Sequence, residues 1–209
     1  MNIGLDDLLA SEPAWILCVD CKVETMRERC WNCEAKLEEA QETRERLAMC
    51  RIPRRFAWAS LDSPELQRRV IYRRPVADLA KRLMASRNAI VGGSTGMGKT
   101  SLAVACLLAR APRCMYVSAD ELSQFGDEKD ALTRRALSVP LLLIDDLGTD
   151  SPNACNDIAH IVFSRHNSER DTWITTGLSV SQISQRYGEG FKRRAVDEVS
   201  RFMLGTSSQ

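Results

Sequence analysis

The feature that most constrains this chain is the segment Gly93–Thr100, which reads Gly-Ser-Thr-Gly-Met-Gly-Lys-Thr. It is a complete G-x-x-x-x-G-K-[ST] phosphate-binding loop. The apolar segment 89–91 before it predicts a short strand, and the Ala- and Leu-rich segment 101–110 after it predicts a helix. A phosphate loop needs this strand–turn–helix context, because backbone N–H groups and a helix N-terminus then face the anion.

The residue types in the loop match the parts of a magnesium-bound nucleoside triphosphate. Glycines let the backbone approach the phosphates with no Cβ in the way. We expect Lys99 to reach the β- and γ-phosphates and the Thr100 hydroxyl to bind Mg²⁺. The residues predicted to hold ATP are Gly93, Ser94, Thr95, Gly96, Met97, Gly98, Lys99, Thr100 and Ser101.

A second acidic motif lies downstream, in segment 140–148, Pro-Leu-Leu-Leu-Ile-Asp-Asp-Leu-Gly. Its apolar run predicts a buried parallel strand with carboxylates at the C-terminal end. In a phosphate-loop protein, Asp145 would hold Mg²⁺, mostly through water, and Asp146 would orient or deprotonate the attacking water. The alternative is an acidic strand-to-turn signal without catalytic meaning.

Four cysteines near the N-terminus form two C-x-x-C pairs, Cys18 with Cys21 and Cys30 with Cys33. Four thiolates can surround one Zn²⁺ tetrahedrally, so the doubled pair predicts a metal site. The site would be structural, because four thiolates leave no open position for catalysis. A redox C-x-x-C pair and buried structural cysteines are the alternatives.

Composition limits the class of protein. The chain has 209 residues, 44% hydrophobic and 27% charged, which suits one α/β domain with a small appendage. No apolar run approaches the roughly 20 residues of a membrane span, and acidic residues near the N-terminus argue against a signal peptide. We therefore expect a cytoplasmic protein that does not bind membranes. Its eight cysteines then favour metal or free thiols over disulfides.

The net charge of +1 is unevenly distributed. Residues 1–50 hold six Lys and Arg against eleven Asp and Glu, whereas residues 51–87 hold ten basic against three acidic residues. An acidic arm before a basic segment indicates two different partners. A solvated linker with arginines on helix faces is the alternative.

The remaining patterns complete an α/β order. Three domains are expected: a zinc-binding arm and helix (1–50), a basic linker and the N-terminal helix of the ATPase domain (51–87), and a P-loop core with a short C-terminal lid (88–209). The expected helices cover 34–50, 76–86, 131–137, 153–168, 180–187 and a last stretch to about 202, and further strands cover 114–118 and 171–176. His160 and His166 are six apart on one helix and are not expected to be ligands.

Four motifs together resemble the DnaC/IstB branch of AAA+ ATPases, which includes bacterial helicase loaders and transposition helpers. They are Ile52-Pro53-x-Arg55-Phe56, the loop 93–100, Leu142-Leu143-Ile144-Asp145-Asp146-Leu147-Gly148, and Thr175-Thr176-Gly177-Leu178-Ser179. The resemblance implies a three-layer α/β fold with a central parallel sheet. It also implies a homo-oligomer in the ATP state, with each site completed by a neighbouring subunit.

The family pattern also assigns roles near the C-terminus. It places an arginine finger in the turn after the sensor helix, which makes Arg194 the candidate here and Arg193 the next, while Arg201 could be a sensor-2 arginine. The family commonly has Asn after the last sheet strand, where this chain has Gly177. Either Thr176, our candidate, or Thr175 takes the sensor role, or hydrolysis is slow.

The resemblance favours an ATPase that loads a replicative DNA helicase onto single-stranded DNA. The cysteine-rich arm is similar to N-terminal domains of some loaders, which dock on the helicase, and transposition helpers generally lack it. An IstB-type helper that binds duplex DNA and recruits a transposase is one alternative. A nucleotide-dependent binding switch with slow turnover is another, and a small-molecule P-loop kinase is the least favoured.

Overall fold

The computed structural model describes residues 15–72, 74–123 and 127–205. The chain forms two compact units, Met1–Arg46 and Leu47–Gln209. The first unit contains a small antiparallel sheet of β1 (Ile16–Leu17) and β2 (Glu24–Thr25), followed by helix α1 (Trp31–Met49), whose last turn belongs to the second unit. Helix α1 has no Pro or Gly and many strong helix formers, which explains its length.

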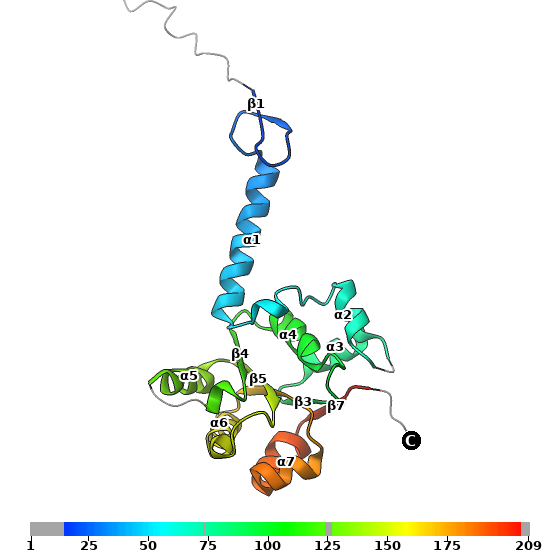
Figure 1. The fold of residues 1–209 in the computed structure, drawn as a ribbon, viewed down its shortest axis with the longest axis vertical. Helices are drawn as coiled ribbons and strands as arrows, with labels where there is room; N and C mark the ends of the chain where they lie inside the picture. Colours follow the sequence, from blue (N-terminus) through cyan, green and yellow to red (C-terminus); the bar gives the residue numbers. More distant parts are fainter. Residues whose placement is uncertain (1–14, 73, 124–126, 206–209) are drawn as a thin grey trace, which may run out of the picture. The chain divides into compact units, whose positions relative to one another are not determined.

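The second unit is built on a five-stranded sheet in which every neighbouring pair is parallel (Figure 1). Short apolar strands such as these are typical of a sheet that is covered on both faces. The strand order is β4-β5-β6-β3-β7, with bounds β3 (Ala89–Gly92), β4 (Cys114–Ser118), β5 (Leu141–Leu147), β6 (Asp171–Thr176) and β7 (Ser200–Met203).

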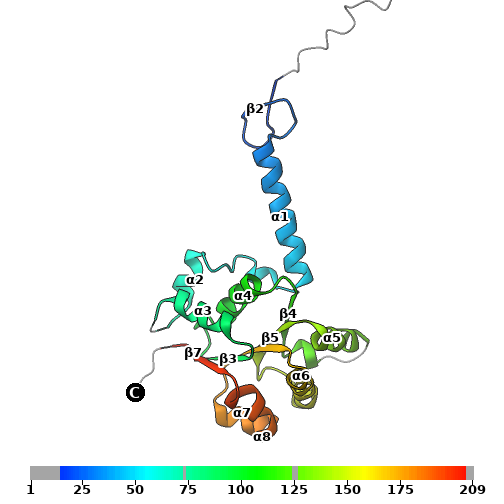
Figure 2. The same cartoon turned by 180° about the vertical axis from the view of Figure 1, so that it is seen from behind.

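Helices cover both faces of this sheet, as Figures 1 and 2 show from opposite sides. Successive strand residues alternate between two cores: Val91 and Leu143 belong to one, Ile90 and Ile144 to the other. The prediction of a three-layer α/β fold is therefore confirmed. One face carries α2 (Pro64–Arg69), α3 (Val76–Ala85) and α4 (Lys99–Arg110), and the other carries α5 (Asp127–Ser138), α6 (Cys155–Asn167), α7 (Val180–Tyr187) and α8 (Glu189–Lys192).

The basic segment before α3 packs against the core of the second unit. It contains a 3-10 turn, η2 (Arg54–Phe56), and helix α2, neither of which was predicted. Ile52, Leu66 and Val70 are buried in the same cluster as α3 and α4. Two further 3-10 turns, η3 (Glu121–Ser123) and η4 (Pro152–Ala154), follow β4 and precede α6.

The prediction of a last helix to about residue 202 is wrong. After α8 the chain makes a π-helical turn, η5 (Arg193–Asp197), and then forms strand β7 parallel to β3. Phe202 is 2% exposed between the exposed residues Arg201 and Met203, which is the alternation of a strand. Pairing with β3 therefore decides the conformation of this segment. The other predicted elements are present, and α5 begins earlier than expected.

Candidate nucleotide and metal sites

The phosphate loop joins β3 to α4 and is held by close backbone contacts. Gly98 has a φ of 81°, and a Cβ at this position would lie 2.6 Å from the carbonyl oxygen of Arg69. Gly93 has a φ of 140°, and its Cβ would lie 2.6 Å from the carbonyl oxygen of Leu204. Glycine is required at both places, because a side chain has neither the space nor the backbone conformation.

Lys99 and the loop surround an open pocket of about 340 Å³. Lys99 is 7% exposed, and its Nζ donates to the carbonyl oxygen of Ser94 at 3.0 Å. The pocket has the size of a small-ligand site. Its lining combines loop residues with the end of β5 and two residues to which sequence reasoning gave no role in the pocket, Phe56 and Arg69. The full lining is Phe56, Arg69, Thr95, Gly96, Gly98, Lys99, Thr100, Ser101, Asp146 and Thr149.

Asp145 is fully buried and accepts three hydroxyl hydrogen bonds. Thr100 and Thr175 donate to Oδ1 at 2.7 and 2.6 Å, and Tyr116 donates to Oδ2 at 2.8 Å. The predicted magnesium residues Thr100 and Asp145 are thus in direct contact, and both present hard oxygen atoms of the kind Mg²⁺ binds. These oxygens fit the ion.

Asp146 lines the pocket in an unusual backbone conformation. Its φ is 52°, in the left-handed region, and the pairing of β5 with β6 shifts register between Ile144 and Leu147. The backbone N–H of Asp146 donates to Thr175 Oγ1 at 2.9 Å. Such strain is common at functional sites. Burial, and then the neighbouring Asp145 carboxylate, raise the pKa of Asp146 above its ordinary value, as suits a general base.

The remaining predicted residues divide between two places. Thr176 is buried, and its hydroxyl donates to the carbonyl oxygen of Leu147 at 2.8 Å, so Thr175 is the threonine that contacts Asp145. Arg194 lies outside the lining of the phosphate pocket: its guanidinium packs over the Phe163 ring at 4.7 Å and donates to Gly190 O at 3.1 Å. Arg193 is exposed and faces Glu198 at 3.6 Å.

Sequence reasoning missed two groups around the motif strand. Tyr116 on β4 reaches Asp145 from the neighbouring strand, and burial, with the Asp145 charge, raises its pKa. The sequence signal that could have revealed this contact is a tyrosine on the neighbouring strand, on the same face of the sheet as the motif. The second group is Asp150, whose buried carboxylate accepts hydrogen bonds from Gly148 N at 3.0 Å, from the Tyr187 hydroxyl and from Arg186. It ties the loop after β5 to α7.

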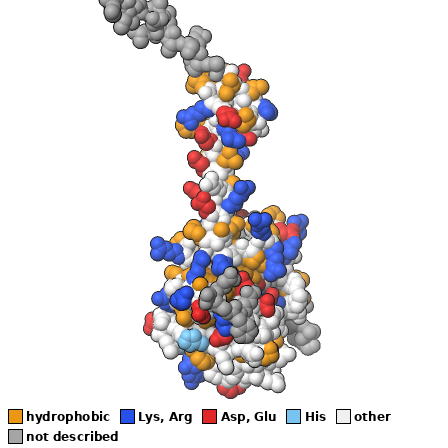
Figure 3. Space-filling view, turned by 60° about the vertical axis from the view of Figure 1, so that its left-hand side comes forward, with side chains coloured by type: hydrophobic (Ala, Val, Ile, Leu, Met, Phe, Trp, Pro, Cys, Tyr) orange, Lys and Arg blue, Asp and Glu red, His pale blue; other side chains and the backbone are white. Residues whose placement is uncertain are grey.

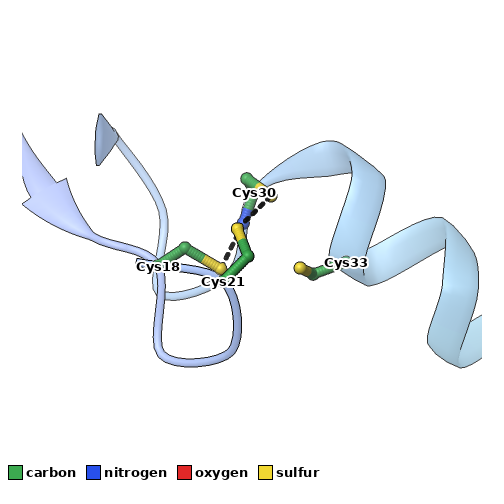
Figure 4. A group of neighbouring side chains, drawn as sticks. All are labelled: Cys18, Cys21, Cys30 and Cys33. Atoms are coloured by element: carbon green, nitrogen blue, oxygen red, sulfur yellow. Dashed lines mark hydrogen bonds between the residues drawn. The ribbon is translucent and has the colours of Figure 1, made fainter. Parts of the chain in front are cut away.

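The four N-terminal cysteines converge from the turn between β1 and β2 and from the start of helix α1 (Figure 4). Their sulfur atoms all lie within 4.8 Å of one another, and Cys21 Sγ is 3.5 Å from Cys30 Sγ. A tetrahedral zinc with four thiolates would have sulfurs about 3.8 Å apart, given a Zn–S distance of about 2.3 Å. The cluster therefore fits zinc in number, ligand type and spacing.

The hydrogen bonds around the sulfurs favour a bound cation. Backbone N–H groups of Cys21 and Cys30 lower the pKa of Cys18 to about 6, which favours the thiolate. Side-chain hydrogen bonds with Cys21 and Cys30 keep the Cys33 thiol protonated and raise its pKa to about 12. A bound divalent cation would displace that proton, because metal binding requires the thiolate.

Apolar side chains are concentrated on the surface of the first unit, where several are visible in Figure 3. Trp31 is 71% exposed, with the Arg27 guanidinium 3.8 Å from its ring centroid, and Trp15 is 63% exposed. A patch this apolar on so small a unit is typical of a protein-binding surface. The exposed apolar residues between 15 and 31 are Trp15, Ile16, Leu17, Val19, Val23, Met26 and Trp31.

The parallel sheet, the phosphate-loop motif and the acidic motif at Asp145 together define a P-loop protein of the α/β class. No protein-family profile and no curated protein matches the sequence. Among solved structures, the chain is similar to the DnaC helicase loader, with 25% identity and a TM-score of 0.56, over 73% of this chain and 100% of DnaC. The resemblance to helicase loaders is thereby confirmed.

Two other structures share the fold. DnaI has 19% identity and a TM-score of 0.56, over 74% of this chain and 95% of DnaI. DnaA bound to AMPPCP and single-stranded DNA has 19% identity and a TM-score of 0.53, over 71% of this chain and 52% of DnaA. No helix among the described residues is long and apolar enough to cross a membrane.

Proposed function

We propose that this protein is an ATPase that loads a replicative helicase onto single-stranded DNA. The observation that carries the proposal is the likeness to the solved chain of the DnaC helicase loader, all of which is covered at 25% identity, together with a complete phosphate loop and acidic motif. Residues 1–50 act as the arm that holds the partner, and the P-loop unit supplies nucleotide-dependent control.

The residues of the pocket have distinct roles in hydrolysis. Lys99 and the loop N–H groups bind the phosphates, and Thr100 and Asp145 hold Mg²⁺, which neutralises phosphate charge when bound. Asp146 accepts the proton of the attacking water, and its raised pKa lies closer to neutral pH than that of an ordinary aspartate, as suits a general base. Arg194, with Arg193 as the alternative, enters the site of a neighbouring subunit in the ATP-bound oligomer and stabilises the transferring phosphoryl group.

The cysteine cluster binds structural zinc, and the zinc fixes the short turns that display the apolar patch at residues 15–31. The exposed Trp15 and Trp31 support protein binding there. Exposed arginines of segment 51–87 support contact with the phosphates of single-stranded DNA, which should weaken steeply with added salt.

The decisive experiment is capture of the host's replicative helicase by the intact, zinc-loaded chain in the presence of ATP. Trp31→Ser should abolish capture while zinc content and ATP binding are unchanged. Val180→Ser, which removes an apolar side chain 38% exposed on the second unit, is the matched control and should capture normally. Recovery of a transposase and no helicase would assign the protein to the transposition helpers instead.

A nucleotide-dependent switch with slow turnover is the second candidate, and one observation favours it. Gly177 has no polar side chain where the family commonly has Asn, and the hydroxyls of Thr175 and Thr176 donate to Asp145 and Leu147. Normal ATP binding without hydrolysis, even with helicase and DNA present, would support the switch.

A further inference from the structure

A second pair of neighbouring cysteines lies in the second unit. Cys50 follows α1 and Cys114 begins β4, and their sulfur atoms are 3.2 Å apart although the residues are 64 positions apart in sequence. Both are buried, at 2% and 3% exposure. The carbonyl oxygen of Cys50 accepts a hydrogen bond from Tyr116 N at 2.9 Å, so the two backbone segments are held side by side.

These two cysteines lie on the wall of an open pocket of about 400 Å³. Its rim includes the exposed side chains of Arg113 and Arg135, and none of the lining residues is acidic. The pocket is therefore positively charged and suits a small anion. The complete lining is Met49, Cys50, Pro112, Arg113, Cys114, Arg135, Ser138, Val139 and Pro140.

We propose that Cys50 and Cys114 form a reactive dithiol that is oxidised to a disulfide by a small anionic disulfide of the oxidised glutathione type. The arginines attract the carboxylates of that reagent to the pocket that the two cysteines line. The phosphate loop and the zinc cluster take no part in this reaction.

The reaction is two successive thiol–disulfide exchanges. One protein thiolate attacks a sulfur of the reagent, the reagent's S–S bond breaks, and one small thiol leaves a mixed disulfide on the protein. The other protein thiolate then attacks the protein sulfur of this mixed disulfide and releases the second small thiol. The protein loses two electrons and two protons, and the reagent gains them.

The geometry favours this pair over the other cysteines outside the zinc cluster. The sulfurs need to approach by only about 1 Å to reach a bond length of about 2.05 Å. Cys106 is fully buried, burial raises its pKa to about 12, and its Sγ faces the Ala80 carbonyl oxygen at 4.0 Å. Cys155 lies beside the Asp150 carboxylate, and burial raises its pKa. Neither has the paired, positively charged setting of Cys50 and Cys114.

The test treats the intact, zinc-loaded chain with oxidised glutathione under native conditions, then traps remaining thiols with an alkylating reagent and maps peptides by mass spectrometry. We expect a product lighter by two hydrogens that links the peptides of Cys50 and Cys114. Its melting temperature should rise by on the order of 10 °C, because the bond closes a long loop that includes the phosphate loop.

Two variants make the result specific. Cys114→Ser should stop at a glutathione adduct on Cys50, and Cys106→Ser, the matched control, should form the disulfide as the natural chain does. If Cys114→Ser fails to fold, Cys114→Ala serves the same purpose. The proposal is overturned if no linked peptide forms, or if Cys106 or Cys155 reacts as fast as the pair.

Discussion

Tyr116→Phe should separate the role of the Asp145 hydrogen bonds from that of the surrounding packing. The Tyr116 hydroxyl donates to Asp145 Oδ2 at 2.8 Å, and Asp145 is fully buried. Phenylalanine keeps the ring and its contact with Phe56, whose centroid lies 6.4 Å away. The substitution therefore removes one donor from the carboxylate proposed to bind magnesium and leaves no large cavity.

The expected cost follows from the burial of that carboxylate. A hydrogen bond to a charged group contributes about 1.5–3 kcal/mol, and the Oδ2 atom has no bulk water to replace the lost donor. The free energy of unfolding should fall by that amount. Asp145 would also be held less firmly toward Thr100, so the Mg²⁺ concentration that half-saturates ATP binding should rise roughly tenfold, which corresponds to about 1.4 kcal/mol.

Tyr187→Phe is the matched control. The Tyr187 hydroxyl also donates to a buried carboxylate, that of Asp150, but Asp150 is outside the lining of the phosphate pocket. It should lose similar stability in urea unfolding and keep its Mg²⁺ requirement, measured by titrating Mg²⁺ at fixed fluorescent ATP. Equal Mg²⁺ requirements in the two variants would refute a positioning role for Tyr116.

Four other substitutions test the remaining site residues. Lys99→Ala should weaken ATP binding, measured by calorimetry, by roughly 10- to 100-fold, because a hydrogen bond from a charged group is lost. Unchanged affinity would exclude a role for Lys99 in phosphate binding. Asp146→Asn should abolish hydrolysis and raise the melting temperature at neutral pH. The raised pKa of Asp146 in the folded state means that its ionised carboxylate destabilises the fold, and asparagine removes that charge. The gain in melting temperature should disappear at pH values below both the folded and the unfolded pKa, because the aspartic acid is then neutral as well. Cys18→Ser with Cys21→Ser should release zinc, measured by metal analysis, and leave ATP binding intact; retained zinc would refute the four-thiolate site. Gly177→Asn should raise the ATPase rate by about tenfold or more, because the new amide would position the attacking water. The side chain has room, since a Cβ at position 177 would lie 3.9 Å from the carbonyl oxygen of Gly93. An unchanged rate would mean that position 177 is not a sensor.

The parts of the fold and site that sequence predicted are those that local pattern determines. The phosphate loop needs glycines at fixed spacing, so Gly93 and Gly98 were visible in the sequence before the contacts that require them. Helix α7 begins at the capping residue Ser179, whose side chain and that of Gln182 satisfy each other's backbone N–H groups. The doubled C-x-x-C spacing indicated a cysteine cluster that the sulfur positions confirm.

The parts that sequence missed depend on contacts between distant segments. Strand β7 has a short, mixed sequence, and its conformation is decided by pairing with β3 across more than a hundred residues. In the sequence, Asp150 looks like an ordinary acidic turn residue. Its role depends on the fold, in which α7 places the Tyr187 hydroxyl against its carboxylate. Cys50 and Cys114 carry no motif, and their segments meet through contacts such as the hydrogen bond from Tyr116 N to Cys50 O.

The position of β6 explains why the sequence could not decide between Thr175 and Thr176 as the proposed sensor residue. This strand lies between β3, which leads into the phosphate loop, and β5, which carries Asp145. Residues at its end therefore face both motifs, and neighbouring threonines point to opposite sides of the sheet. Thr175 donates to Asp145 and accepts from the N–H of Asp146, whereas Thr176 bonds to the Leu147 backbone. Because Thr175 contacts both acidic residues of the motif, it is better placed than Thr176 to link the proposed Mg²⁺ ligand Asp145 to the proposed catalytic base Asp146.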